Sequence, residues 1–290
     1  MASGISGHLQ HNPTRGIFAG GGSDSNVIDY ITISSAGNAT DFGDLTVGRA
    51  VMSSGANSET RGMFFGGFPA SVNSNVVDYV TILTAGNATD FGDLTVATRA
   101  TSALTNQTRA CVGGGVSGAI TNVIDYFTIA SVGNATDFGD LTVARYGLAG
   151  CNSDTRGVWG GQNAGDTIDY ITIATTGNAT DFGNLSVARQ DCGAINSDVR
   201  GLFGAGSGTS NVIDYITIAT TGNATDFGDL LAGVNSGIMG CNSLTRGIFA
   251  GGAGASNVIQ YVTIATLGNA TDFGDLTLGR DGGSYCQDGL

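Results

Sequence analysis

Short runs of β-branched and aromatic residues, separated by glycine-containing turns, recur along the whole chain. The clearest run, residues 123–129 (Val-Ile-Asp-Tyr-Phe-Thr-Ile), is apolar on both faces of an extended strand. A strand of this kind is buried on both sides, and without helices to cover it the pattern indicates sheets stacked on sheets. A Gly-Asn pair at 133–134 predicts a tight hairpin into the alternating run at 135–141. The chain is therefore predicted to be all-β, with almost no helix.

The same pattern occurs six times. The tyrosine of the buried run marks each copy, at Tyr30, Tyr79, Tyr126, Tyr170, Tyr215 and Tyr261. A spacing of this size is typical of propeller blades. Each copy divides into four strands: a variable strand A, a glycine-rich strand B after an arginine-containing turn, the buried strand C and the alternating strand D. We predict one β-propeller domain over residues 1–290, with six blades of four antiparallel strands and repeats at about 14–59, 60–107, 108–154, 155–198, 199–244 and 245–290.

Two segments compete for strand A of the first blade. Residues 280–290 match a strand A, and so does the N-terminal segment within residues 1–13. We expect a terminal strand to close blade 1 and leave open which end supplies it. The surplus segment is a predicted attachment point for a neighbouring subunit or another protein, because an unpaired strand can extend a sheet edge.

The repeated residues resemble the kelch motif. The resemblance rests on a Gly-Gly pair ending strand B, an Asp-Tyr pair in strand C, a later aromatic such as Phe138, and an arginine such as Arg145 before the next blade. The chain departs from that motif in carrying phenylalanine where kelch repeats often have tryptophan. The expected fold is thus a kelch-like six-bladed propeller.

Nearly identical copies containing Gly-Asn-Ala-Thr-Asp-Phe-Gly also resemble kelch-type repeats in structural proteins of tailed phages, especially marine and cyanobacterial ones. This resemblance implies a non-enzymatic virion protein, part of a tail, fibre or capsid-attached propeller, made in the host cytoplasm. Its implied partners are other virion proteins and a host-surface glycan or protein. The alternative is a propeller lectin or a kelch peptide-binding module of a bacterium.

The charge narrows the range of functions. The formal net charge is −13, and all 11 cationic residues are arginines. Binding to nucleic acid or to an anionic membrane requires cations that meet phosphates, so we predict neither partner. No run is long enough to span a bilayer, and the N-terminus lacks the pattern of a signal peptide, so no membrane insertion is expected. The five cysteines form an odd set without metal-site spacing and are predicted to be reduced thiols.

The sequence has few candidate catalytic residues. The two histidines, His8 and His11, both lie in the N-terminal segment and are expected on an exposed strand face. We therefore predict no enzyme activity, no catalytic residues, no cofactor and no metal.

The arginines occupy two repeated positions, and both are interpreted as structural. Those after strand D are expected to pair with strand C aspartates, because antiparallel order places them at one face of the ring. The expected pairs are Arg49 with Asp78, Arg99 with Asp125, Arg145 with Asp169, Arg189 with Asp214 and Arg280 with Asp29. The blade that has Val234 in place of the arginine also has Gln260 in place of the aspartate. An ion pair predicts that its arginine and its aspartate are replaced together.

The second set of arginines opens strand B. It is expected to lie near the aspartates that open strand D. The arginines are Arg15, Arg61, Arg109, Arg156, Arg200 and Arg246, and the aspartates are Asp41, Asp90, Asp137, Asp181, Asp226 and Asp272.

The loops between strands B and C differ most between copies. Variable loops on a rigid scaffold commonly carry binding residues, so their face is the predicted interaction surface. The candidate residues are Phe68, Pro69, Val72, Ile120, Gln162 and Asn163. Loops that vary without binding any ligand remain the alternative.

Overall fold

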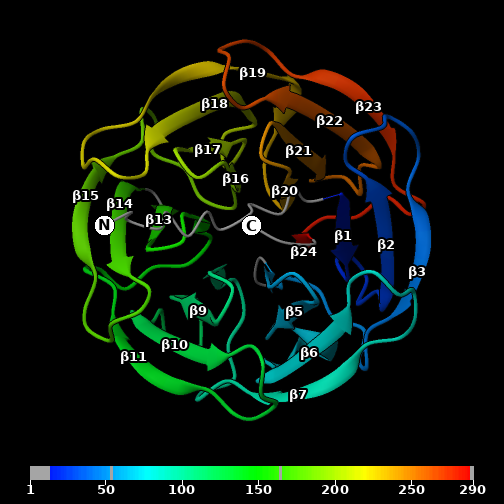
Figure 1. Cartoon of the computed structure of the whole chain (residues 1–290), viewed down its shortest axis with the longest axis vertical. Coiled ribbons are helices and arrows are strands. Elements are labelled where there is room, and N and C mark those ends of the chain that lie inside the picture. Colours follow the sequence, from blue (N-terminus) through cyan, green and yellow to red (C-terminus); the bar gives the residue numbers. More distant parts are fainter. Residues whose placement is uncertain (1–13, 53–54, 163–164, 288–290) are drawn as a thin grey trace, which may run out of the picture.

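Six four-stranded antiparallel sheets surround one axis, as Figure 1 shows. This computed structural model describes residues 14–52, 55–162 and 165–287. The described residues contain strands and a single 3-10 turn, η1 (Pro69–Ser71). The predicted all-β six-bladed propeller is confirmed.

The blades follow one another in chain order, and each blade has four strands that succeed one another from the axis outward. Blade 1 contains β24 (Ser284–Gln287), β1 (Arg15–Ala19), β2 (Val27–Thr32) and β3 (Thr40–Asp44). Blade 2 contains β4 (Ala56–Asn57), β5 (Arg61–Phe65), β6 (Val76–Thr81) and β7 (Thr89–Asp93). Blade 3 contains β8 (Ser102–Thr105), β9 (Arg109–Gly113), β10 (Val123–Thr128) and β11 (Thr136–Asp140).

The second half of the ring repeats this order. Blade 4 contains β12 (Ala149–Asn152), β13 (Arg156–Gln162), β14 (Gly165–Thr172) and β15 (Thr180–Asn184). Blade 5 contains β16 (Gly193–Asn196), β17 (Arg200–Gly204), β18 (Ser210–Thr217) and β19 (Thr225–Val234). Blade 6 contains β20 (Ile238–Asn242), β21 (Arg246–Gly251), β22 (Val258–Thr263) and β23 (Thr271–Asp275).

The C-terminal strand closes the ring. Strand β24 pairs antiparallel with β1, with Ile17 opposite Cys286 and Ala19 opposite Ser284. Blade 1 therefore combines strands from both ends of the chain, and β24 fills the position nearest the axis (Figure 1). Residues 1–13, the other predicted claimant for this position, lie outside the described residues.

Apolar side chains fill the space between neighbouring blades. Between blades 1 and 2, for example, Ile17 and Phe42 lie in one buried cluster with Phe64 and Val80. Each blade is covered on both sides by its neighbours, which explains why strand C is apolar on both faces. All five cysteines are free and buried, and burial raises the pKa of Cys111 to about 12. Burial also raises the pKa of Cys151 and Cys192, so these three thiols are protonated packing residues at neutral pH.

The Gly-Asn segments connect neighbouring blades at the outer rim. They do not form the predicted tight hairpins, since residues 33–39 separate β2 from β3. Instead, the Gly37 and Ala39 N–H groups donate to the carbonyls of Phe273 and Asp275 in β23 of blade 6. Equivalent contacts recur around the ring. The partner of each Gly-Asn segment lies in another blade, so the prediction of a tight hairpin from the pattern within one repeat is wrong.

The same contacts explain the glycine of strand D. In β3, Gly43 has φ +150°, and an added Cβ would lie 2.5 Å from the Gly86 carbonyl oxygen. Only glycine permits this approach. Each outer strand is therefore covered along its edge by the next blade, which removes it as a site for pairing with another chain.

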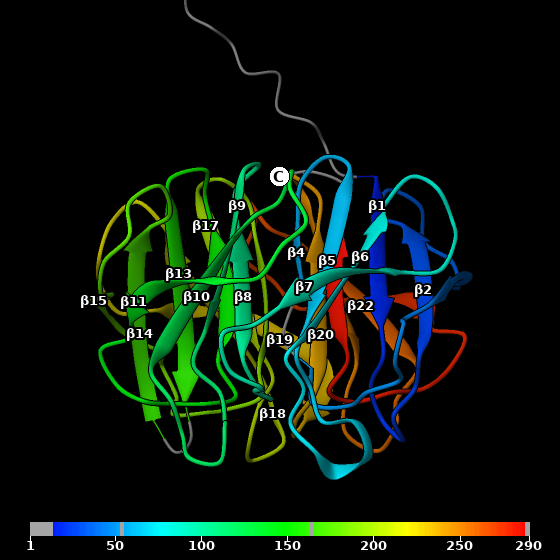
Figure 2. The ribbon, with the colours of Figure 1, turned by 90° about the horizontal axis from the view of Figure 1, so that it is seen from below.

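The molecule has two different faces. Figure 2 shows the connections between strands B and C, together with the crossings that lead from strand D to strand A of the next blade, at the lower face. We call this the loop face. The opposite face carries the A-to-B turns and the C-to-D segments, and we call it the turn face. No helix in the described part of the chain is long and apolar enough to cross a bilayer.

Candidate functional site

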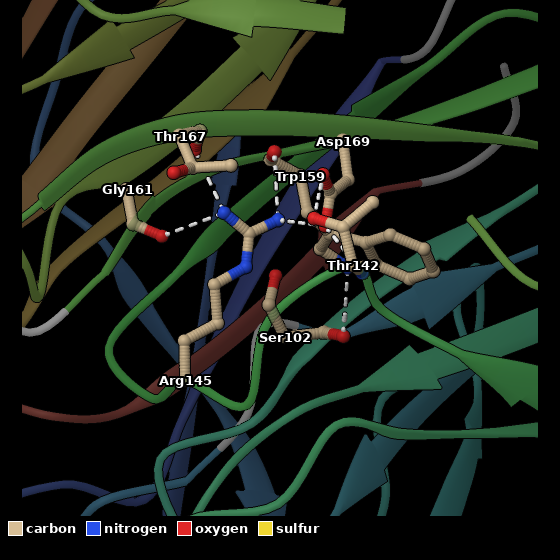
Figure 3. A network of polar contacts seen from close by, with 7 residues as sticks. All are labelled: Ser102, Thr142, Arg145, Trp159, Gly161, Thr167 and Asp169. Atoms are coloured by element: carbon tan, nitrogen blue, oxygen red, sulfur yellow. Dashed lines mark hydrogen bonds and ion pairs between the residues drawn. The ribbon is translucent and has the colours of Figure 1, made fainter. Parts of the chain in front are cut away.

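Each crossing between blades can carry a buried polar clamp, and the crossing from blade 3 to blade 4 shows it completely (Figure 3). Arg145 Nη2 lies 2.9 Å from Asp169 Oδ2, and Nη1 donates to the Thr167 carbonyl at 2.7 Å. Thr142 donates to the same carboxylate from its backbone N–H at 3.1 Å and from Oγ1 at 2.6 Å. Arg145 and Asp169 are almost fully buried. The clamp thus ties the chain leaving blade 3 to strand C of blade 4.

Three other crossings have the same ion pair. The pairs are Arg49–Asp78 at 3.0 Å, Arg189–Asp214 at 2.6 Å and Arg280–Asp29 at 2.6 Å. In each of them a threonine or serine hydroxyl also donates to the aspartate. The structure thus brings together four of the five pairs expected from the repeat.

The crossing into blade 6 lacks the ionic clamp. Gln260 takes the aspartate position, and its Oε1 accepts from the Leu231 N–H at 2.8 Å. Leu231 also replaces the usual threonine, so all three clamp positions have changed together, at Leu231, Val234 and Gln260. The replacement of threonine was missed at the sequence level, although counting from Leu230 would have found it. A neutral crossing avoids leaving a buried charge alone.

The pairing expected for Arg99 and Asp125 needs correction. Counted from Leu94, Thr98 takes the place of the arginine, and Arg99 follows one position later in a crossing of the same length as the one into blade 4. The Thr98 N–H donates to the Ser74 carbonyl at 2.9 Å, as the Arg49 N–H does to Ser25 at 3.1 Å. The shift by one position moves Arg99 out of reach of Asp125.

Arg99 instead organises two loops on the loop face. Its Nη1 donates to Asn73 Oδ1 at 2.8 Å, and its guanidinium lies 4.1 Å from the centre of the Phe68 ring. Asn73 Nδ2 in turn donates to the Val116 carbonyl at 2.9 Å. The B-to-C loops of blades 2 and 3 are thereby joined.

Asp125 retains only part of a clamp. It accepts from the Thr95 N–H at 2.9 Å and from Thr95 Oγ1 at 2.7 Å. It is buried without an arginine, and this burial raises the pKa of Asp125 above its ordinary value. The same carboxylate position therefore has different chemistry in blades 3 and 4.

The arginines that open strand B do not pair with the strand D aspartates. Arg156 lies on the face of blade 4 that carries Tyr170, whereas Asp181 pairs with Asp169 on the opposite face. Strand alternation therefore separates the expected partners. Arg156 stacks 4.3 Å from the centre of the Tyr170 ring and donates to the Ile218 carbonyl of blade 5 at 3.0 Å. The other arginines of this set make the same two contacts.

An amide ring surrounds the mouth of the axial channel on the turn face. Its members end the innermost strands and are Asn57, Asn152, Asn196, Asn242 and Gln287. The Asn242 N–H donates to Gln287 Oε1 at 3.0 Å, and the Asn196 N–H donates to Asn242 Oδ1 at 3.0 Å. The side-chain oxygens of Asn152, Asn196, Asn242 and Gln287 accept from neighbouring blades, so their NH2 groups point elsewhere. Those of Asn152 and Asn196 have no acceptor among the residues that the structure describes.

Tyr285 divides the channel. The other innermost strands have a small residue at its position, such as Ala103, Gly150 or Gly240. Tyr285 crosses the axis, and its hydroxyl donates to the Ala194 carbonyl of blade 5 at 3.4 Å. It lines both the amide ring and the cavity on the other side. The C-terminal strand thus closes the channel as well as blade 1.

The cavity at the loop face is the axial funnel. Its volume is about 70 Å³, and it is lined by Val51, Met52, Leu148, Asp191, Ile238 and Tyr285 among others. Asp191 is partly exposed, and burial among apolar groups raises its pKa. Gln190 Nε2 donates to Asp191 Oδ2 at 3.0 Å. The funnel therefore combines apolar walls with a carboxylate.

The rim of the axial funnel has unusual backbone geometry. Six residues, one per crossing, are left-handed, and three of them are glycines. The other three are Val51 at φ +50°, Ala100 at φ +53° and Asp191 at φ +56°. Such conformations cost about 1–3 kcal/mol for residues with a Cβ and often mark functional positions. Sequence reasoning missed these residues, and comparing them with Gly147 and Gly282 in the other copies is the signal that finds them.

The predicted loop residues differ in exposure. Val72 is 66% exposed and Ile120 is 44% exposed, on the loop face. Phe68 and Pro69 are half-buried. Gln162 is the last residue of β13, not a loop residue, and Asn163 lies outside the described residues.

We compared the chain with known proteins. No protein-family model and no curated protein matched it. The kelch and phage likenesses therefore remain resemblances of motif. In the described part of the chain, no group of three or more His, Cys, Asp and Glu side chains is placed to hold a metal ion. His8 and His11 are outside that part.

Proposed function

We propose that the protein is a non-enzymatic interaction module that serves as a structural component of a phage virion, in a tail, a fibre or a capsid-attached assembly. The propeller fold fits a protein-interaction module. The phage assignment rests on the resemblance of the repeat to phage structural proteins. In this proposal the chain is made in the host cytoplasm and contacts other virion proteins, with a host-surface glycan or protein as a further partner.

One observation carries the choice of surface. The repeated arginines, most strand C aspartates with their Thr or Ser partners, and the Gly-Asn segments are occupied by contacts between blades, which accounts for their repetition without any ligand. The loop face of blades 2 and 3 breaks the repetition and exposes Val72 and Ile120. Exposed apolar side chains beside loops fixed by Arg99 favour binding to a protein surface.

The test begins with the purified virion of a phage that encodes the chain. Mass spectrometry of the virion is expected to find the protein, and a Val72→Ser/Ile120→Ser double variant is expected to lose most of its incorporation. The matched control is Leu83→Ser/Val132→Ser, because these residues are 56% and 58% exposed on the turn face. Absence of the chain from purified virions would overturn the virion proposal, and equal loss in both variants would overturn the choice of face.

The amide ring favours the lectin alternative as a second candidate. Free NH2 groups of Asn152 and Asn196 suit the hydroxyl oxygens of a sugar. A glycan array probed with the wild type and with Asn196→Asp tests it, since aspartate retains the acceptor for the neighbouring N–H and loses the donors. Binding that Asn196→Asp abolishes would support a lectin, and an array without any binding would reject it.

A further inference from the structure

We propose that the axial funnel on the loop face binds a lysine or arginine side chain presented by a partner protein. This inference deepens the proposed function, since it rests on the loop face being the interaction surface. The funnel offers a cavity of about 70 Å³, apolar walls for an aliphatic stem and the Asp191 carboxylate for a cationic head group. Lysine and arginine combine such a stem with such a head group.

The charge of the loop face supports a cationic occupant. Strands D end at this face, and four of them close with half-buried aspartates at Asp44, Asp93, Asp140 and Asp275. The crossing arginines do not offset these charges, because four of them are buried in the clamps. Arg99 already lies between Asn73 and Phe68. Together with the net charge of −13, this leaves excess carboxylates on the outer strands of this face, and their potential favours the approach of a cation.

The backbone of the rim supports a role for the side chains that line it. Gly147, Gly237 and Gly282 adopt the left-handed conformation without strain, whereas Val51 and Asp191 adopt it despite their Cβ atoms. A β-branched residue is especially unfavourable there. The ring geometry alone would be satisfied by glycine, so the strain points to the side chains themselves.

The funnel is also continuous with the loops that break the repeat. The Phe68 N–H donates to the Ala50 carbonyl at 2.8 Å, and the Ala100 N–H donates to the Val51 carbonyl at 3.0 Å. The backbone that carries Val51 is thereby held by blade 2 on one side and by the crossing into blade 3 on the other. A partner on the exposed apolar loops would lie directly beside the funnel.

The test uses the full chain and blocked pentapeptides Gly-Ser-Lys-Ser-Gly and Gly-Ser-Arg-Ser-Gly. The same peptide with norleucine keeps the stem without the charge, and the glutamate peptide reverses the charge. NMR titration of backbone amides is expected to show shifts at Asp191, Gly147 and Gly237 with the cationic peptides only. Shifts confined to the turn face, or equal shifts with norleucine, would contradict the proposal.

Variants separate the funnel from general electrostatic attraction. Asp191→Asn is expected to weaken cationic peptide binding by about tenfold, because a desolvated charge pair contributes more than an exposed one. Val51→Gly removes an apolar wall at a position where glycine is unstrained, so it is expected to fold and to bind several-fold more weakly. The control Asp166→Asn changes the same charge on the same face and is expected to stay within about twofold. Equal loss in Asp191→Asn and Asp166→Asn would reduce the effect to diffuse attraction and overturn the site.

The outcome is independent of the virion test. Peptide binding in the funnel with no chain in purified virions would remove the phage role and leave the site intact. Presence of the chain in virions without binding of any of the four peptides would keep the phage role and remove the site.

Discussion

The crossings into blades 3 and 4 start from nearly the same sequence and end in different structures. Leu-Thr-Val-Ala-Arg at 141–145 places Arg145 on Asp169 inside the protein. Leu-Thr-Val-Ala-Thr-Arg at 94–99 places Thr98 at that point and sends Arg99 to the surface, where it stacks on Phe68. An arginine placed one position later thus supports two exposed loops in place of a buried clamp.

The comparison shows which charged residues hold blades together in the interior and which shape the surface. In the regular crossings, arginine and aspartate hold neighbouring blades together and are hidden from any partner. In the crossing into blade 3, the displaced arginine shapes the loop face and the aspartate remains buried without it. Function is therefore to be sought where the repeat is broken.

The largest expected effect separates the two aspartates. Asp169→Ala leaves Arg145 buried without its partner, and we expect a loss of about 3–5 kcal/mol in the free energy of unfolding. Asp125→Ala removes a carboxylate that has no arginine but accepts from Thr95, and the expected loss is smaller, about 1–3 kcal/mol. Denaturant unfolding of both variants measures the difference. Similar losses would mean that the two crossings are energetically alike.

A pair of glycine variants tests whether the outer rim is the same at both crossings. Gly92 and Gly139 have φ +143° and +144°, and an added Cβ would lie 2.4 Å and 2.6 Å from a backbone atom of the next blade. Alanine at either position is expected to cost about 1–3 kcal/mol, equally in both. Gly86→Ala is the control, because nothing lies within 4 Å of its Cβ position. A large difference between Gly92→Ala and Gly139→Ala would show that the displaced arginine also affects the rim.

The smallest expected effect is a pH dependence. Burial raises the pKa of Asp125 in the folded protein, while the unfolded chain has a value of about 3.9. Between these two values the folded state binds more protons, so the free energy of unfolding falls as pH rises. Relative to Asp125→Asn, the wild type is expected to lose stability as pH rises above about 3.9, up to the raised folded pKa, and to change little below it. Unfolding curves across this range that run parallel for the two proteins would contradict the raised pKa.

Much of the scaffold can be predicted from the sequence because every copy of the repeat has the same physical constraints. The buried strand C and the tyrosine spacing are sufficient for six blades, and the joint replacement of Val234 and Gln260 points to the clamp. The displaced Arg99 was predictable by counting from Leu94, but the arginine was assigned by its order in the motif. The motif identifies the residue types, whereas the number of residues between Leu94 and the arginine decides which partner the arginine reaches.

Other features needed information that one repeat does not contain. The Gly-Asn segments pair with a neighbouring blade, and the Arg–Tyr stacks depend on which side of a strand each residue occupies. The choice of β24 to close blade 1 depends on competition between two distant segments. Tyr285 and the strained Val51 become visible only when equivalent positions are compared around the axis.

The central claim is that the clamp into blade 3 is missing because Thr98 stands at the arginine position and Arg99 lies one position later. The variant Thr98→Arg/Arg99→Ala places an arginine four residues after Leu94, as Arg145 lies four residues after Leu141, and NMR titration of the side-chain carboxyl carbon then measures the pKa of Asp125. We predict that the pKa falls below the wild-type value, because the arginine now reaches the carboxylate and favours its charged form. An unchanged or higher pKa of Asp125 in this variant would contradict the account.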